Sequence, residues 1–311
     1  MPQSVPYELD RPAVAPVEEI TGLASRAEAA DGDPPFSDQT LVDLRSAPGG
    51  RVRTVLARAS GGELLGAAVR VREPDDAAAL VELVVDPGHR RGGIGAALAA
   101  VLAEETADAV RAWAHGGHPG AAALAARHGL VPVRDLHRLL RPLGGAPDLP
   151  LPEAMPAGYR LRAFEPGRDE DEWLRVNAAA FAGHPEQGRM TLEDLRQREA
   201  EPWFDPAGFL LAVRSGEPGT VAGFHWTKVH PGDGERPALG EVYAVGVAPE
   251  HQGTGLGRAL TAAGVNHLAR QGLGEVMLYV DGDNTAALRL YERLGFRPWH
   301  LDVMYARDAP A

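Results

Sequence analysis

The feature that most constrains the fold is a glycine-containing segment that occurs twice. The first copy, LVELVVDPGHRRGGIGAALAAVLAEE, starts at residue 80, and the second, GEVYAVGVAPEHQGTGLGRALTAAGVNHLA, starts at residue 240. About 35 residues beyond the first glycines, RHGL at 127–130 matches RLGF at 293–296. We therefore interpret the chain as two copies of one fold, of which either one or both bind ligand. The alignment pairs Gly93 with Gly255, Gly95 with Gly257, Pro87 with Pro249, and Arg90 with Gln252.

Five prolines separate the two copies, in the stretch RPLGGAPDLPLPEAMPAG at 141–158. Prolines this dense exclude a helix or a central strand and favour an extended, semi-rigid linker. A chain of 311 residues also fits two domains of about 100–200 residues each. We predict an N-terminal domain at 1–141, a linker at 142–158 and a C-terminal domain at 159–311.

Hydrophobic periodicity predicts the elements of the second copy. Strands are expected at 159–164, 209–214, 221–229, 242–247, 276–281 and 296–305, and helices at 169–182, 255–271 and 284–294. An antiparallel meander is thus followed by strand–helix–strand units. The prediction is an α/β fold of the mixed α+β kind, in which a central mixed β-sheet is flanked by helices. The first copy repeats a shortened version of it.

The segment VGVAPEHQGTGLGRAL at 245–260 combines a strand, a glycine-containing turn and the start of a helix. Glycines let the backbone coil with its N–H groups pointing inward, and the N-terminus of a helix adds partial positive charge. Such a nest suits a diphosphate. The segment is not a Walker A loop, which would need Gly-Lys-Ser/Thr. It also does not match the dinucleotide fingerprint G-x-G-x-x-G, because Arg258 takes the last position of that pattern.

At this point the chain resembles the GCN5-related N-acetyltransferase superfamily, and both copies do. The resemblance implies that acetyl-CoA is the co-substrate, with its diphosphate on the turn and its pantetheine arm along the strand before it, where a splay from the next strand opens a slot. In the second copy the implied residues are Val245, Gly246, Val247, Gln252, Gly253, Thr254, Gly255, Leu256, Gly257, Arg258, Asn284, Thr285, Ala286, Ala287, Leu288 and Arg289. In the first copy they are Leu83, Val84, Val85, Arg91, Gly92, Gly93, Ile94, Gly95 and Ala96.

A closer resemblance is to the mycothiol synthase family, whose members are tandem acetyltransferases. It is carried by AFAGHPEQG at 180–188, WFDP at 203–206, GFHWTKVHP at 223–231, LGEVYAVGV at 239–247 and LYVDGDNTAA at 278–287, with WAHG and DPPFSDQ in the first copy. The family acetylates the cysteinyl amine of cysteinyl-glucosaminyl-inositol in the last step of mycothiol biosynthesis. The resemblance implies acceptor contacts at Asp38, Glu186, Lys228, Glu241 and Tyr279.

Acetyl transfer to an amine needs a group that takes a proton from the amine and a group that protonates the departing thiolate. Glu241 opens the strand before the turn and is the candidate base; the alternative is a carboxylate at an exposed strand edge. Tyr291 is the candidate acid, by analogy with the superfamily, and the alternative is a tyrosine that packs on the sheet. The first copy has Ala79 and Ala125 at the aligned positions. We therefore expect the N-terminal domain to bind acetyl-CoA without catalysing transfer.

Composition narrows the classes of function that remain open. A net charge of −12 argues against binding to nucleic acid or to an anionic membrane, and no apolar run reaches the ~20 residues of a membrane span. The chain has no cysteine, no metal-ligand spacing and no signal peptide, so we expect a cytoplasmic enzyme without a metal, acting as a monomer. Lys228 is the only lysine. Two rival interpretations stay open: an acetyltransferase for another amine, such as an aminoglycoside, and an acyl-CoA sensor without turnover.

Overall fold

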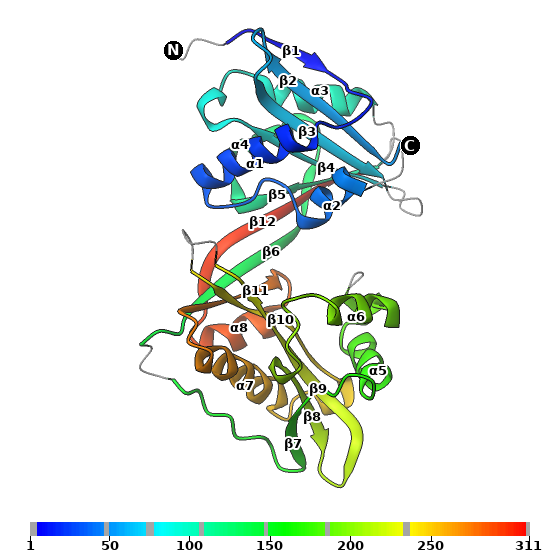
Figure 1. Cartoon of the computed structure of the whole chain (residues 1–311), viewed down its shortest axis with the longest axis vertical. Coiled ribbons are helices and arrows are strands. Elements are labelled where there is room, and N and C mark those ends of the chain that lie inside the picture. Colours follow the sequence, from blue (N-terminus) through cyan, green and yellow to red (C-terminus); the bar gives the residue numbers. More distant parts are fainter. Residues whose placement is uncertain are drawn as a thin grey trace. The chain divides into compact units, whose positions relative to one another are not determined.

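A computed structural model describes residues 5–46, 50–72, 78–105, 109–145, 149–183, 187–232 and 237–308. The chain forms two compact units (Figure 1). Unit 1 comprises Met1–His137, Asp281–Asp283 and His300–Ala311, and unit 2 comprises Arg138–Val280 and Asn284–Trp299. The units therefore interleave in sequence, because the end of the chain belongs to the unit that the N-terminus begins.

Unit 1 is a six-stranded mixed sheet with helices on both faces. Its strand order is β1 (Tyr7–Asp10), β2 (Val52–Ala59), β3 (Leu64–Arg72), β4 (Ala78–Val85), β5 (Ala109–Ala114) and β12 (Arg297–Arg307). Helices α1 (Val17–Asp31) and α2 (Asp38–Ser46) pack on one face through a cluster that includes Ile20 and Phe36. Helix α3 (Ile94–Glu105) packs on the other face through Ile94 and Leu98, and α4 (Pro119–Arg127) follows β5.

Unit 2 repeats this plan. Its strand order is β6 (Val131–Pro142), β11 (Glu275–Asp281), β10 (Leu239–Val247), β9 (Glu217–His230), β8 (Phe209–Arg214) and β7 (Tyr159–Ala163). Helices α5 (Glu170–Ala180) and α6 (Leu192–Glu199) cover one face through an aromatic cluster around Trp173. Helices α7 (Leu256–Arg270) and α8 (Thr285–Arg293) contribute to the apolar cluster on the other face. Every strand and helix expected in the second copy is present, which confirms the predicted mixed α/β fold.

The strands that close the two copies are exchanged. Strand β6 follows α4 of the first copy, yet its residues 138–142 belong to unit 2. Strand β12 follows α8 of the second copy, yet its residues 300–307 belong to unit 1, where residues 303–307 pair antiparallel with β5. The predicted linker is tied to unit 2, because Leu151 is buried there and exchanges hydrogen bonds of 2.8 Å with the side chain of Asn266. We keep the predicted linker at 142–158 as a proposal for where the two copies are divided along the sequence. In the folded structure, the final strand of the chain belongs to unit 1.

The duplication is also visible in the packing between sheet and helix. Gly66 in β3 and Gly223 in β9 occupy matching ladder positions, opposite Val85 and Val247. A Cβ atom at either glycine would lie 3.0 Å from Cδ1 of a helix leucine, Leu98 in unit 1 and Leu260 in unit 2. The absence of a side chain at both positions thus lets the helix that follows the glycine turn lie close against the sheet.

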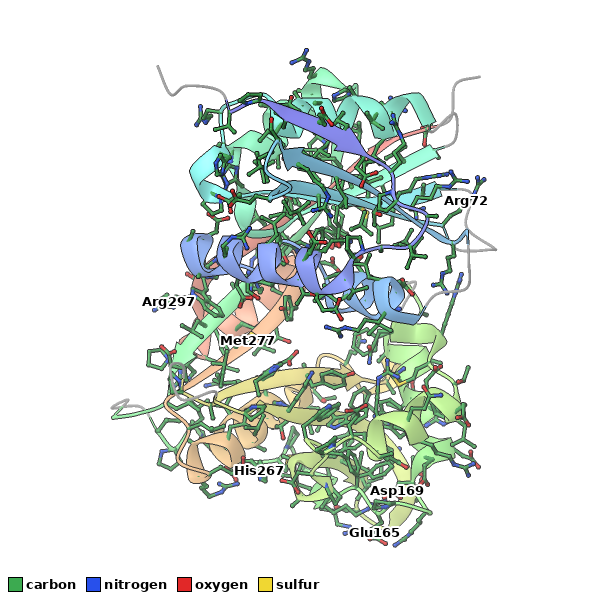
Figure 2. The ribbon with its side chains drawn as sticks, turned by 45° about the horizontal axis from the view of Figure 1, so that its top comes forward. Arg72, Glu165, Asp169, His267, Met277 and Arg297 are labelled. Carbon is green, nitrogen blue, oxygen red and sulfur yellow. The ribbon has the colours of Figure 1, made fainter. Side chains whose placement is uncertain are left out.

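A buried ion pair fixes the connection between β7 and α5. Nη2 of Arg162 donates to Oδ1 of Asp169 over 2.7 Å, and the amide of Glu165 donates to Oδ2 of the same carboxylate over 2.8 Å. Figure 2 shows Glu165 and Asp169 close together at the end of unit 2. Because Asp169 is the residue before the helix, its carboxylate also lies at the positive end of the helix dipole. None of the helices in the described ranges has the length and apolar character needed to cross a bilayer.

Candidate active site

The glycine-containing turn of unit 2 presents free backbone donors at the start of α7. Gly255 is the N-cap residue, with a left-handed φ of 87°, and Gly253 has φ 74°. No cap side chain binds the first-turn amides, which have no acceptor within the helix. A Cβ atom at Gly253 or Gly255 would meet no atom within 4 Å, so the approach to the amides of 252–258 is open. This arrangement fits a diphosphate.

The two central strands of unit 2 part beside this turn. The parallel ladder between β10 and β11 joins Gly240–Val242 to Val276–Leu278, and no pairing of these strands continues through residues 243–247. On its other side β10 stays paired with β9 up to Val247, apart from a bulge in which Tyr243 is the extra residue. The backbone of Val245, Gly246 and Val247 is therefore available on the β11 side, where the resemblance implies the pantetheine arm.

Glu241 lies at the last part of β10 that is still paired on both sides. Its side chain is 8% exposed, and Oε2 lies 2.7 Å from Nε2 of His230 on β9. Glu241 is the ladder partner of Lys228, so the carboxylate shares a sheet face with Lys228 and His230, the face on which α5 and α6 pack. The predicted base is therefore a buried carboxylate and not an exposed strand edge.

Lys228 presents a positive charge beside two aromatic rings. Its Nζ lies 5.0 Å from the ring centre of Trp203 and 5.5 Å from that of Tyr243. The hydroxyl of Tyr243 in turn accepts a hydrogen bond of 3.0 Å from Nε of Arg198 on α6. Within the described part of the chain, the ammonium group has no carboxylate partner, although Glu241 is directly opposite in the ladder. Such a cation suits a ligand with hydroxyl or anionic oxygens.

Tyr291 lies on α8, within the apolar cluster that covers the α7 face. Its ring contacts that of Phe296, with centroids 5.7 Å apart, and the residue is 6% exposed. Burial raises the pKa of Tyr291 above its usual value, so its hydroxyl stays protonated at neutral pH. Glu241 and Tyr291 thus lie on opposite sides of the sheet, and a thioester placed where β10 and β11 part would lie between the two sides.

The remaining sequence-predicted residues of unit 2 are at the start of α8 and on β11. Asn284 caps α8, its Oδ1 accepting from the amide of Ala287 over 3.1 Å, and residues 284–286 are exposed. Tyr279 is 43% exposed, and the guanidinium of Arg138 lies 5.9 Å from its ring centre. Glu186 lies outside the described residues. The backbone of Asp38 begins α2 in unit 1, and its side chain also lies outside what the structure describes.

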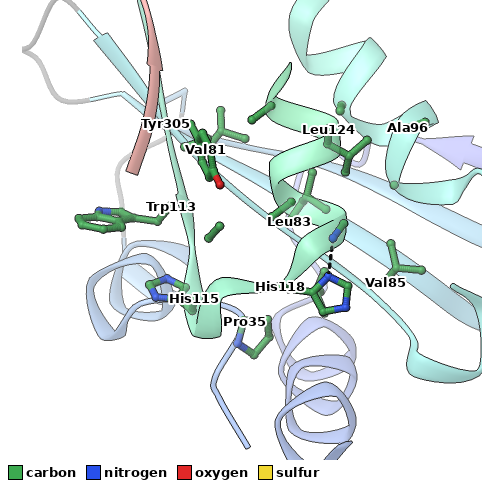
Figure 3. A pocket seen from close by; sticks show the side chains of 18 of the residues that line it. Pro35, Val81, Leu83, Val85, Ala96, Trp113, His115, His118, Leu124 and Tyr305 are labelled. Carbon is green, nitrogen blue, oxygen red and sulfur yellow. Dashed lines mark hydrogen bonds between the residues drawn. The ribbon is translucent and has the colours of Figure 1, made fainter. Parts of the chain in front are cut away.

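Unit 1 has a cavity of about 670 Å³ at its own glycine turn (Figure 3). The predicted residues Leu83, Val84, Val85, Arg91, Gly93, Ile94, Gly95 and Ala96 line it, whereas Gly92 does not. Arg91 has φ 65°, the left-handed conformation that Gly253 adopts at the aligned position. The β4–β5 ladder ends at Val81 and Ala112, so these strands also part beside the turn. His118 caps α4 by accepting from the amide of Gly120 over 3.0 Å, the dashed contact in Figure 3.

Unit 1 lacks both candidate catalytic side chains. The ladder between β3 and β4 has no bulge, so counting from the turn places Leu80 at the ladder position of Glu241, and not Ala79 as the ungapped alignment suggests. Ala125 does match Tyr291, because the carbonyl of each accepts from the amide five residues later. A leucine and an alanine cannot transfer protons. Unit 1 therefore lacks a base and an acid at these positions whether Ala79 or Leu80 is aligned with Glu241.

A buried ionic network borders the cavity of unit 1. The imidazole of His115 lies between two carboxylates, with Nδ1 3.1 Å from Oδ2 of Asp302 on β12 and Nε2 3.0 Å from Oε1 of Glu82 on β4. The carboxylate of Glu82 also accepts from the amide of Ser37, just before α2, over 3.1 Å. The final strand of the chain therefore helps to hold the helix that begins at Asp38. No group of three or more histidine and acidic side chains in the described ranges could hold a metal ion.

This network predicts a pH-dependent stability. Burial alone would lower the pKa of His115, but hydrogen bonds and negative charges from Asp302 and Glu82 outweigh burial and raise the pKa to about 9. An unfolded histidine titrates near 6.5. The stabilisation, on the order of 3 kcal/mol, is therefore complete below pH 6.5 and is lost as the pH rises through 9. Urea unfolding at a series of pH values should show this decline in the wild-type protein.

The matched variants isolate this histidine. His115→Gln should flatten the decline in the free energy of unfolding between pH 6.5 and pH 9. His118→Asn keeps a good helix cap at an exposed position and should retain the wild-type slope. An unchanged slope in the His115 variant would show that other groups cause the pH dependence.

Sequence reasoning did not identify His230, Tyr243 or the network around His115. A signal for His230 was present, because Lys228 and His230 are two residues apart in a strand and so share a face. The bulge at Tyr243 and the contribution of Asp302 had no comparable signal, since each depends on pairing between strands that are distant in sequence.

Comparison with known proteins identifies the family to which the chain belongs. The profile of the Acetyltransferase (GNAT) family matches residues 19–130 and 173–296, one match in each copy. The mycothiol acetyltransferase of Kocuria rhizophila is 60% identical over 289 residues, covering 93% of this chain and 95% of the relative. That of Thermobispora bispora is 54% identical over 291 residues, with 93% and 95% coverage.

Solved structures agree with the tandem fold. A GCN5-related N-acetyltransferase from Sphaerobacter thermophilus superposes with a TM-score of 0.74 at 28% identity, covering 99% of this chain and 98% of that one. A tandem GNAT protein from the clavulanic acid biosynthesis pathway reaches 0.71 at 24% identity, with 98% and 99% coverage, and supports the fold alone. The chain therefore belongs to the GNAT acetyltransferase family and, within it, to the mycothiol acetyltransferases, which confirms the resemblance seen in the sequence.

Proposed function

We propose that this chain transfers the acetyl group of acetyl-CoA to the cysteinyl amine of cysteinyl-glucosaminyl-inositol, completing mycothiol, by direct attack in a ternary complex. The observation that carries the proposal is the buried Glu241 carboxylate at the point where β10 and β11 part. The relatives named mycothiol acetyltransferase, at 60% and 54% identity, support the choice of acceptor. The chemical class of the acceptor is a small molecule that carries an amine and many hydroxyl groups.

Each group in unit 2 has a part in this reaction. The amides of 252–258 and the parted edge of β10 hold acetyl-CoA, with the start of α8 beside it, so that both substrates share one site. Glu241 takes a proton from the ammonium ion, so that the neutral amine can bond to the thioester carbon. The carbon–sulfur bond then breaks, and the nitrogen loses its second proton. The hydroxyl of Tyr291 then gives a proton to the departing thiolate. A general base and acid of this kind contribute about 10²–10⁴-fold to the rate.

Acceptor binding follows from charge and hydrogen bonding. Glu241 attracts the cationic amine, and Lys228 is suited to the oxygens of the sugar or inositol. Asp38, Glu186 and Tyr279 complete the proposed contacts, on the strength of the family resemblance. Unit 1 is proposed to bind a second acetyl-CoA in its cavity without catalysing transfer, because leucine and alanine replace the base and the acid.

Thiol release from acetyl-CoA with the purified protein tests the proposal. We expect turnover with cysteinyl-glucosaminyl-inositol and none with an aminoglycoside. Turnover with the aminoglycoside alone would show that the chain acetylates a different acceptor. Release with neither amine, from protein that still binds acetyl-CoA, would favour a sensor without catalysis.

A further inference from the structure

The geometry around the candidate base raises a question of proton balance. An α-amino group has a pKa of about 7.7–8.0, so the acceptor amine arrives mostly as an ammonium ion near neutral pH. Its nitrogen loses two protons when it becomes an amide. One of them replaces the proton that Tyr291 gives to the sulfur of CoA, and the other must leave the protein in every turnover.

Glu241 has little direct contact with water through which to release that second proton. Its side chain is 8% exposed, and its one hydrogen-bond partner among the described residues is the imidazole of His230, at 2.7 Å. Lys228 is opposite in the ladder, but its ammonium lies over aromatic rings and makes no ion pair with this carboxylate in the described structure. A lysine ammonium is in any case a donor without an acceptor site.

His230 has the position that such a path requires. It is the last residue of β9, and its side chain is 36% exposed, so one end of the ring reaches solvent while Nε2 contacts the buried carboxylate. Imidazole can accept a proton at one nitrogen and release one from the other.

We propose that His230 carries the excess proton from Glu241 to solvent, which makes it a positioning and relay residue that acts through the base. After Glu241 has taken the amine proton, the carboxylic acid gives it to Nε2 of the neutral imidazole. The hydrogen on Nδ1 then passes to water. This leaves the Glu241 carboxylate and a neutral imidazole with its hydrogen on Nε2. Proton exchange of the imidazole with water returns the hydrogen to Nδ1 before the next turnover, and no oxidant or further reactant is needed. The inference rests on the proposed role of Glu241.

Two substitutions separate the relay from a purely structural contact. His230→Gln retains an N–H group that can hold the carboxylate in place but cannot carry a proton. His230→Gly leaves room for free imidazole. We expect kcat to fall by about 10²-fold in both, with the KM for acetyl-CoA unchanged. Imidazole in the buffer should restore kcat of the glycine variant in proportion to its concentration, and should not affect the glutamine variant.

The controls use the full chain with the same acceptor. His267→Gln alters a histidine of α7 that contacts Asp205, and it should keep wild-type kcat with no response to imidazole. Glu241→Gln should be slow and insensitive to imidazole, because the group that hands over the proton is missing. Wild-type kcat in His230→Gln would overturn the relay, as would a folded His230→Gly protein that imidazole does not restore. Full activity in Glu241→Gln would instead contradict the proposed base itself.

Discussion

Gly255→Asp is expected to abolish productive acetyl-CoA binding and to lower kcat/KM by at least about 10²-fold, which corresponds to about 3 kcal/mol. The residue has φ 87°, a conformation that costs an ordinary residue roughly 1–2 kcal/mol, and its side chain would point into space that is open to the diphosphate. The added carboxylate would repel the anion and lie at the start of α7, where the free amides would bind it instead. Steady-state kinetics and calorimetric titration with acetyl-CoA measure both effects.

Two matched variants test whether the loss of acetyl-CoA binding comes from the added charge and from the turn of unit 2. Gly255→Asn adds a side chain of the same size that tolerates the left-handed backbone without charge, so we expect a smaller loss of about tenfold. Gly93→Asp makes the same change at the N-cap of α3 in unit 1, where φ is 89°. It should remove one of two binding events in calorimetry while turnover persists. Loss of turnover in Gly93→Asp with full turnover in Gly255→Asp would reverse the roles of the units.

Glu241→Gln is expected to lower kcat by about 10²–10⁴-fold while the KM for acetyl-CoA stays within about twofold. The substitution preserves volume and hydrogen bonding to His230 and removes the ability to take a proton. Glu275→Gln changes an exposed carboxylate at the start of β11 and should leave kcat unchanged. A wild-type kcat in the Glu241 variant would mean that another group, or water alone, deprotonates the amine.

The fold could be predicted because its signals are local. The turn at 252–258 is flanked by a strand and a helix in the sequence itself, and the same pattern in the first copy indicates the duplication. The prolines led us to predict a boundary between the copies at 142–158, which stays a prediction. The exchange of β6 and β12 could not be predicted, because each pairing joins strands that are distant in sequence and leaves no local signal.

The sequence was enough to predict which residues belong to the site, but it was not enough to predict the contacts between them. Glu241 and Lys228 could be selected from their strands, but the contact between Glu241 and His230 depends on the register of β9 against β10. The bulge at Tyr243 shifts that register by one residue, which no periodicity indicates. The network of His115 links β4 and β12 through the residue that follows β5, and Asp302 is 187 residues from His115 in the chain.

We propose that a thioester held by the amides of 252–258 reaches Glu241 through the place where β10 and β11 part. A crystal structure of the complex with CoA measures this directly. We expect the diphosphate to lie on the first-turn amides of α7 and the sulfur to lie between the two strands, facing the Glu241 carboxylate. A diphosphate bound elsewhere, or a sulfur that remains on the α7 side and out of reach of that carboxylate, would contradict it.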